Sequence, residues 1–276
     1  MKNKVSVIIL THNSYKDKAG SIEFVINAYL QQKHKPFEIV VVDNASDVNN
    51  SAKLQSFCAD KKSVHIVKCN ASIGGARNLG VKHSKGDYVI FNDDDTTPMQ
   101  DNILEIVSQY CDNGRYGYGA TRLWSPDIKW VKSHENDIKN AIDIKNWSYL
   151  NKISIQPNLN IRAKNSTSLK MLTRSFIGNF GFISSKDFIS VIGFPEYLGY
   201  GCEDDAFAFL CYLKLGRPII LAKDISVLHI SHKLSKQNLT ELESNKLKLE
   251  KLFKQNSCGH FHISRLLFPS DKPIID

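Results

Sequence analysis

The stretch Gly86-Asp-Tyr-Val-Ile-Phe-Asn-Asp-Asp-Asp95 places three consecutive acids after the apolar run Tyr88–Phe91. A short, nearly continuous apolar run is typical of a buried strand in a parallel sheet. Adjacent carboxylates repel one another, and a divalent cation shared with a second anionic group relieves this repulsion. Mg²⁺ and Mn²⁺ bind carboxylate oxygens and fill their other positions with phosphate or water. The stretch therefore indicates a strand that ends at a metal–diphosphate site, and a solvated acidic turn is the alternative.

The first hundred residues alternate apolar runs with helical patterns. Strands are expected at Val5–Leu10, Phe37–Val42, Val64–Val67 and Tyr88–Phe91, with helices between them. This alternation predicts a parallel α/β sheet that binds its ligands at the carboxyl ends of its strands. Polar clusters follow three of these strands: Thr11-His12-Asn13, Asp43-Asn44 and Asp93-Asp94-Asp95. The sequence therefore predicts one site, built from three loops.

The second half of the chain is less regular. Residues 112–170 are interpreted as strands and loops that cover the site. Three later elements are expected: a helix at Ala206–Leu215 and strands at Ile219–Ala222 and Ile225–Ile230. The tail, Lys236–Asn256, predicts a basic amphipathic helix with one apolar face formed by Leu239, Leu242, Leu249, Leu252 and Phe253. We expect this helix to pack on the domain, and the alternative is peripheral association with an anionic membrane.

Composition narrows the class of protein. The chain has 276 residues, of which 42% are hydrophobic and 23% charged, as in soluble globular enzymes. Its six cysteines form no C-x-x-C pair, so we expect reduced thiols in a cytoplasm rather than a zinc site or disulfides. No apolar run reaches the length of a signal-peptide core or a membrane span. The net charge of +8 indicates attraction to an anion: nucleotide phosphate, a membrane face or nucleic acid.

Five stretches together resemble glycosyltransferase family 2, nucleotide-sugar enzymes of the GT-A fold. They are Val5–Asn13, Val40–Ser46, Gly74-Gly-Ala-Arg-Asn-Leu-Gly80, Gly86–Asp95 and Gly201-Cys-Glu-Asp-Asp205, and the resemblance covers residues 4–100 and 175–232. It implies an α/β fold with a Rossmann-like, mostly parallel central sheet flanked by helices. The expected domain spans 1–232, with a nucleotide-binding half at 1–100 and an acceptor and catalytic half at 101–232. Residues 233–276 would form the helical tail.

The resemblance also implies how the nucleotide is held. Asp43 would accept a charge-assisted hydrogen bond from N3–H of uracil, beside Asn44. Thr11, His12 and Asn13 would line the base and ribose, and Arg77 would face the nucleotide. The residues alone leave two alternatives open. Asp43 also suits a turn into the next helix, and Arg77 also suits a surface salt bridge.

The acidic triplet resembles the D-x-D motif of the family. By that match Asp95 binds Mn²⁺ or Mg²⁺ directly, while Asp93 and Asp94 hold the ribose or metal-bound water. The metal would neutralise the diphosphate and stabilise the UDP leaving group. His229 is the expected further metal ligand because a neutral imidazole suits Mn²⁺. His232 is the alternative, or a contact to the acceptor.

The stretch Gly199-Tyr-Gly-Cys-Glu-Asp-Asp205 is similar to the Trp-Gly-x-Glu-Asp stretch of inverting galactosyl- and N-acetylgalactosaminyltransferases. In that match Asp204 is the general base that deprotonates the acceptor, and Glu203 contacts a sugar. Tyr200 supplies an aromatic platform where the family often has Trp. The alternative is that these acids cap a helix.

The function expected from these features is inverting, metal-dependent transfer of a hexose or N-acetylhexosamine, galactose-type favoured, from a UDP-sugar to a glycan hydroxyl. A lipid-linked acceptor at the inner face of a bacterial membrane, in surface polysaccharide synthesis, is the expected setting. A sugar-1-phosphate nucleotidyltransferase is disfavoured because no glycine-rich basic loop follows the first strand. A non-catalytic nucleotide or nucleic-acid binder would have no use for Glu203-Asp204, and no nucleic-acid partner is expected.

Overall fold

The computed structural model describes residues 3–35, 37–124, 133–155, 170–173, 176–230 and 236–255. The strands in these ranges are β1 Val5–Thr11, β2 Glu38–Asn44, β3 Val64–Cys69, β4 Tyr88–Asp93, β5 Thr96–Pro98, β6 Gly117–Trp124, β7 Ser154–Ile155, β8 Lys170–Thr173, β9 Phe180–Ser184 and β10 Ile219–Ile230. The helices are α1 Ser14–Asp17, α2 Ser21–Leu30, α3 Val48–Cys58, α4 Ile73–His83, α5 Ile103–Asp112, α7 Glu135–Asp143, α8 Trp147–Ile153, α10 Ser185–Ser190, α11 Glu203–Leu215 and α12 Lys236–Gln255.

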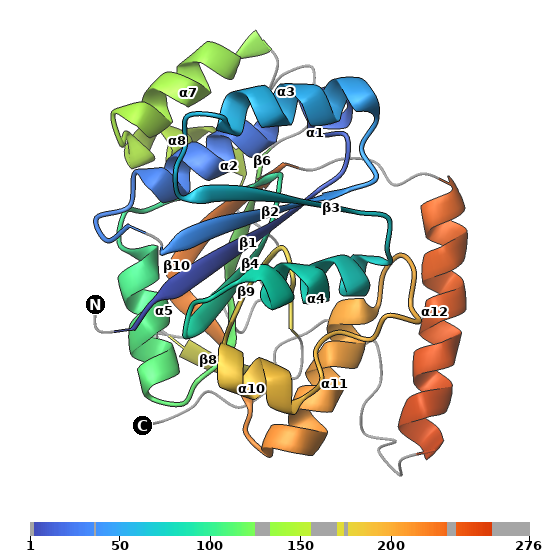
Figure 1. Ribbon diagram of the computed structural model, residues 1–276. Helices are drawn as coiled ribbons and strands as arrows, with labels where there is room; N and C mark the ends of the chain where they lie inside the picture. The colour runs from blue at the N-terminus through green and yellow to red at the C-terminus, as the bar shows by residue number, and fades with distance from the viewer. Residues whose placement is uncertain are drawn as a thin grey trace.

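One sheet runs through the whole fold, in the order β3-β2-β1-β4-β9-β6-β10-β5 (Figure 1). Its first four strands are parallel, as the sequence predicts. Thr11 of β1 is in register with Asp43 of β2, and Leu10 is in register with Asp93 of β4. The carboxyl ends of β2, β1 and β4 therefore meet at one edge, and the three polar clusters lie together there.

The second half of the sheet is mixed. β9 is antiparallel to both β4 and β6, whereas β10 is parallel to β6 and antiparallel to β5. The expectation of two separate strands at Ile219–Ala222 and Ile225–Ile230 is wrong. They form the single strand β10, whose register shifts between Ala222 and Ser226. A bulge of this kind bends a strand without ending it, so the polar Lys223-Asp224 pair only looks like a turn.

Residues 112–170 also differ from the expectation of strands and loops. Two helices, α7 and α8, lie there together with β6 and β7. Ile138, Ala141 and Ile142 of α7 are buried against Phe24 and Ala28 of α2. Their spacing of three and four residues is the signal of a helix face, but over a nine-residue helix the signal is short.

The core has two parts because the sheet is covered on both faces. On one face, α2, α3 and α5 pack over a cluster that includes Val7 and Ile9 of β1. On the other, α4, α10 and α11 pack over a cluster that includes Ile8 of the same strand. Figure 1 shows α2 and α3 on one side of the sheet and α4, α10 and α11 on the opposite side. Burial of both faces explains why the strands appear in the sequence as continuous apolar runs.

The tail helix packs on the domain, as expected. Leu249 and Leu242 of α12 join a small core with Leu198, Cys202 and Phe209. Figure 1 shows α12 at the right-hand edge of the molecule, on the side of α11. The side chains of three other residues predicted for this face lie outside the description: Leu239, Leu252 and Phe253. None of the helices in the described ranges is long and apolar enough to cross a membrane.

Candidate active site

Asp94, the central acid of the triplet, is fully buried and points into the protein. One carboxylate oxygen accepts a hydrogen bond from the Thr11 hydroxyl at 2.6 Å, and the other accepts one from the Lys18 ammonium at 2.5 Å. Burial raises the pKa of Asp94, and Lys18 acts in the opposite direction. Both oxygens therefore hold protein groups, and Asp94 anchors the triplet to β1 and to the loop after α1.

Asp95 lies between the side chains of Lys18 and His229. Its carboxylate is 3.3 Å from the Lys18 ammonium and 3.4 Å from Nε2 of His229, and its side chain is almost completely buried. β5 follows Asp95 directly and pairs with β10 so that Thr96 is opposite His229, which brings the imidazole to the triplet. Burial lowers the pKa of His229, but Asp95 and Asp93 outweigh this effect and raise it overall. His232 lies outside the described residues.

Lys18 is a site residue that the sequence analysis missed. Burial lowers the pKa of its ammonium, but Asp94, Asp95 and Asp93 outweigh burial and raise it above its ordinary value. The lysine is followed by Ala19 and Gly20, which both have positive φ angles, 56° and 72°. A left-handed pair of residues marks a sharp turn rather than a binding site. The sequence around Lys18 therefore does not identify it as a site residue.

Arg77 joins the triplet to the second acidic cluster. Its guanidinium is buried and lies 3.2 Å from Asp93, 2.8 Å from Glu203 and 2.9 Å from Asp204. Gly178 makes this geometry possible, since a Cβ there would lie 2.4 Å from Cζ of Arg77. The salt bridge that was the alternative for Arg77 is thus present, but it is buried rather than at the surface. The expected contact to a nucleotide stays a prediction.

Glu203 and Asp204 begin α11 but do not cap it. The N-cap is Cys202, whose side chain makes no capping hydrogen bond. One Asp204 oxygen accepts from the Gly178 N–H at 2.8 Å, and the other accepts from Arg77 at 2.9 Å. Oε1 of Glu203 accepts from Arg77 at 2.8 Å, whereas the buried Oε2 has no hydrogen-bond partner among the described residues. A buried carboxylate oxygen without a partner can accept a hydrogen bond from a hydroxyl group of a ligand.

The pKa of Asp204 lies well above that of an ordinary carboxyl group. Burial raises its pKa to about 8, and Glu203 adds to the rise, while Arg77 and the Gly178 N–H act in the opposite direction. A carboxylate with a raised pKa is a stronger base, and a base works best when its pKa lies near the working pH.

The third acid of α11, Asp205, is buried and carries a stability prediction. Burial, with help from Glu203, raises its pKa from 3.8 to about 7. The unfolded chain therefore releases this proton at lower pH than the folded chain, and stability falls as the pH rises from about 4 to about 7. The Asp205→Asn variant lacks this proton equilibrium. Its free energy of unfolding, relative to that of the parent chain, should therefore be about 2 kcal/mol higher at pH 8 than at pH 5. The variant also loses the favourable interaction of a first-turn carboxylate with the helix dipole, which offsets part of its gain in stability.

Urea unfolding at the two pH values measures this difference. Asp137→Asn is the matched control, because Asp137 also lies in the first turn of a helix but is exposed. The control should be slightly destabilised at both pH values. Equal behaviour of the two variants would show that burial of Asp205 has no effect on its proton.

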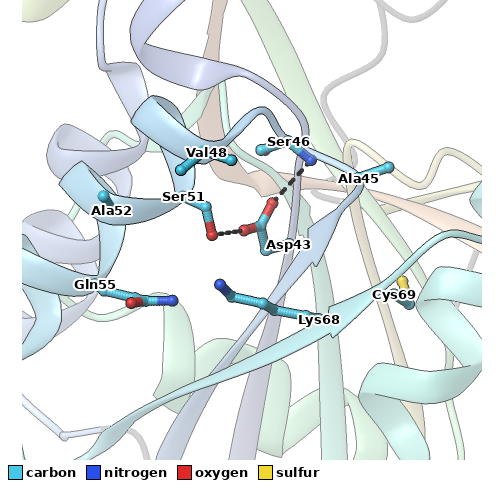
Figure 2. Close-up of a pocket in the computed structure, with 9 residues that line it drawn as sticks. All are labelled: Asp43, Ala45, Ser46, Val48, Ser51, Ala52, Gln55, Lys68 and Cys69. Atoms are coloured by element: carbon cyan, nitrogen blue, oxygen red, sulfur yellow. Dashed lines mark hydrogen bonds between the residues drawn. The ribbon is translucent and has the colours of Figure 1, made fainter.

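Asp43 lies in a pocket of about 300 Å³ between the ends of β2 and β3 and the start of α3. Its carboxylate accepts from the Ser51 hydroxyl at 2.7 Å and from the Ser46 N–H at 3.3 Å. Figure 2 shows these two bonds, with the side chains of Gln55 and Lys68 extending toward one another in the same pocket. The turn interaction that was the alternative for Asp43 is thus present, and the carboxylate lines the pocket as well.

The other predicted nucleotide residues tie loops together. Nδ1–H of His12 donates to the Asn44 carbonyl at 2.8 Å, because a carbonyl can only accept. The side-chain amide of Asn44 bonds Ala71 in both directions, at 2.9 and 3.0 Å. Asn13 accepts from the Asp47 N–H at 2.9 Å. His12 is exposed beside the pocket, whereas Asn13 and Asn44 fix the loops around it.

The residues present fit a divalent cation bound together with an anionic ligand. Two permanent cations, Lys18 and Arg77, face five carboxylates: Asp93, Asp94, Asp95, Glu203 and Asp204. When all five acids are ionised, their negative charge exceeds that of the two cations, which at a largely buried site favours a further cation. Within the described ranges no three His, Cys, Asp or Glu side chains form a ready-made metal cage. Mg²⁺-type sites commonly use one or two carboxylates and take their other ligands from phosphate and water.

Comparison with known proteins identifies the family. The family described as Glycosyl transferase family 2 matches residues 6–177, more than half of the chain. The chain belongs to this family. Its fold is GT-A: a solved structure of GalNAc-T7 with UDP, GalNAc and Mn²⁺ aligns with a TM-score of 0.66 at 14% identity, over 95% of this chain and 51% of that one.

Two curated relatives carry similar descriptions. The uncharacterized glycosyltransferase YfnE of Bacillus subtilis (strain 168) is 23% identical over 272 residues, which is 88% of this chain and 68% of YfnE. An uncharacterized glycosyltransferase of Rickettsia bellii (strain RML369-C) is 34% identical over 119 residues, 43% of this chain. The chain spans only 16% of the length of that protein.

Proposed function

We propose that this domain is an inverting, metal-dependent glycosyltransferase that moves a sugar from UDP to a hydroxyl of a glycan. The observation that carries the proposal is the arrangement of two acidic clusters around Arg77. One cluster, Asp93–Asp95, suits a cation and a diphosphate. The other, Glu203-Asp204, offers a base and a free carboxylate oxygen for a sugar.

The donor would bind along the carboxyl edge of the sheet. β2 and β4 are the two neighbours of β1. The backbones at Asp43 and Asp93 are therefore about 10 Å apart, twice the spacing of adjacent strands. Asp43 would accept N3–H of uracil in the pocket of Figure 2. Gln55 and Lys68 supply hydrogen-bond donors for a carbonyl oxygen of the base in the same pocket. The exposed His12 would lie against the base or ribose.

Asp95 and His229 would hold Mn²⁺ or Mg²⁺, with Asp93 next to the diphosphate or ribose. When bound, the metal supplies charge neutralisation for the UDP leaving group. Asp94 keeps Asp95 in place through Thr11 and Lys18, and Lys18 adds a positive charge at the same point. His229 would bind as the neutral imidazole, so metal and proton would compete for it.

Asp204 would act as general base. Hydrogen bonds from Gly178 and Arg77 fix the position of its carboxylate. Its raised pKa suits removal of a proton from a hydroxyl group as the hydroxyl oxygen attacks the anomeric carbon. Glu203 would hold a sugar hydroxyl through Oε2. A single displacement assisted by one base inverts the configuration of the sugar.

The choice of sugar and acceptor rests on the sequence and the net charge. The Gly-Tyr-Gly-Cys-Glu-Asp stretch favours a galactose-type donor, and GalNAc-T7 is a neighbour that was solved with UDP, GalNAc and Mn²⁺. We propose a growing glycan, lipid-linked at the cytoplasmic face of a bacterial membrane, as acceptor. The net charge of +8 supports association with an anionic membrane surface.

The test is release of UDP from a panel of UDP-sugars by the purified chain, first with Mn²⁺ and then with EDTA. The proposal predicts slow, metal-dependent release from one donor, UDP-galactose or UDP-N-acetylgalactosamine in the favoured case. A sugar-1-phosphate nucleotidyltransferase would instead release pyrophosphate from UTP and a sugar 1-phosphate. Metal-dependent pyrophosphate release without UDP release would replace the proposal with that alternative.

A further inference from the structure

The catalytic acids follow a strained turn. Gly201 and Cys202, the two residues before Glu203, have positive φ angles of 78° and 67°. A left-handed conformation strains a residue other than glycine, which here is Cys202. A turn of this kind persists only where the surrounding structure fixes it. The position of Glu203 and Asp204 therefore depends on whatever holds this turn.

One buried side chain of α12 holds it. Asn245 is fully buried, and its amide nitrogen donates to the carbonyls of Tyr200 at 3.0 Å and Gly201 at 3.2 Å. The Lys248 ammonium donates to Oδ1 of Asn245 at 3.1 Å, which sets the orientation of the amide. The amide group thus uses its donors on the turn and its acceptor within α12.

The apolar contacts of α12 fall on the same side of the helix. Leu242 and Leu249, which lie three residues before and four after Asn245, pack in the core that also contains Cys202. A Cβ at Gly201 would lie 2.6 Å from Cδ1 of Leu242. α12 therefore packs directly against the Gly201–Cys202 turn, and Asn245 lies between the two leucines that make this contact.

We propose that Asn245 is a positioning residue, which acts through the Gly201–Cys202 turn to place Glu203 and Asp204 for transfer. The proposal rests on the proposed function of Asp204 as base. It assigns the tail helix a role in the chemical step and none in donor binding. Asn245 contacts the turn before α11, whereas Asp43 lies at the end of β2 and Asp95 follows β4. A misplacement of about 1 Å at a reacting group lowers a rate by about 100-fold.

The test uses Asn245→Asp in the full chain. Asp has the same shape but, when ionised, offers no donor to the two carbonyls, and Lys248 compensates its charge. We expect kcat for UDP release to fall by about 10- to 100-fold, while the Kd for UDP with Mn²⁺ changes by less than about twofold. Leu247→Ala is the matched control, because Leu247 is exposed on the same helix. Its kcat and Kd should match those of the parent chain.

A purely structural role of Asn245 would give a different pattern. It would lower the melting temperature of Asn245→Asp and leave kcat unchanged well below that temperature, which would overturn the proposal. A parallel fall in kcat and in UDP affinity would overturn it as well. If Asn245→Asp does not fold, Lys248→Met removes only the group that orients the amide. It should lower kcat about two- to fivefold at constant Kd, and an unchanged kcat overturns the proposal.

Asp204→Asn, measured in parallel, distinguishes failure of the proposed base from failure of the proposed positioning role of Asn245. An active Asp204→Asn enzyme would show that the proposed base is wrong. A loss of kcat in Asn245→Asp would in that case still locate the chemical step at the turn, and an unchanged kcat would refute the positioning role by itself.

Discussion

Asp204→Asn is expected to lower the rate of sugar transfer by about 1,000-fold, within the 10²- to 10⁴-fold range that general bases contribute. The amide oxygen of Asn can still accept from Gly178 or Arg77, so the local structure should persist. What is lost is the group that takes the acceptor proton. Affinity for UDP should change by less than about twofold, because donor-binding residues lie on other elements.

Two measurements check this expectation: UDP release with a donor sugar, and the Kd of UDP by calorimetry. Asp205→Asn is the matched control, since it removes the neighbouring carboxylate, which makes no contact with Arg77, and should leave transfer near the parent rate. In the parent chain the rate should rise with pH up to about 8, because burial raises the pKa of Asp204 to about 8 and only the ionised form is a base. Normal transfer by Asp204→Asn would refute the assignment of the base.

Asp95→Ala is expected to remove most of the dependence of UDP binding on metal. In the proposal Asp95 is the carboxylate that holds the cation against the diphosphate, and its side chain is buried between Lys18 and His229. The Kd for UDP with Mn²⁺ should rise about 10- to 100-fold, which is about 1.4 to 2.8 kcal/mol. It should approach the Kd that the parent chain shows with EDTA.

Calorimetry of UDP with Mn²⁺ and with EDTA tests this prediction. Asp60→Ala is the control, because Asp60 is an exposed acid just after α3, and its variant should bind UDP as the parent chain does. If Asp95→Ala keeps the full difference between Mn²⁺ and EDTA, the metal binds elsewhere.

The sequence predicts the parts of the fold that have a local pattern. β1, β2 and β4 are continuous apolar runs because they are buried on both faces, and each is found where it is expected. The edge strand β3 is also found where it is expected, although it is only partly buried. The three polar clusters at one edge, one of which is the acidic triplet, follow from the same pattern. β10 was divided wrongly because a bulge that carries Lys223 and Asp224 has the composition of a turn.

The contacts that complete the site have no local pattern. Lys18 meets Asp94 across 76 residues, Arg77 meets Glu203 across 126, and Asn245 meets Tyr200 across 45. Lys18 and Asn245 have no local signal that indicates a site, and Arg77 was expected at the nucleotide rather than between two acidic clusters. Only the folded sheet and helices bring these groups together, so sequence periodicity does not identify them.

The most direct test of the account is calorimetric titration of the full chain with UDP, in Mn²⁺ and then in EDTA. The account predicts binding in Mn²⁺ that weakens at least about tenfold, or about 1.4 kcal/mol, when the metal is removed. It also predicts weak binding of Mn²⁺ alone, because the diphosphate completes the coordination. Absence of UDP binding in both conditions, or equal affinity in both, would contradict a metal-dependent nucleotide-sugar site.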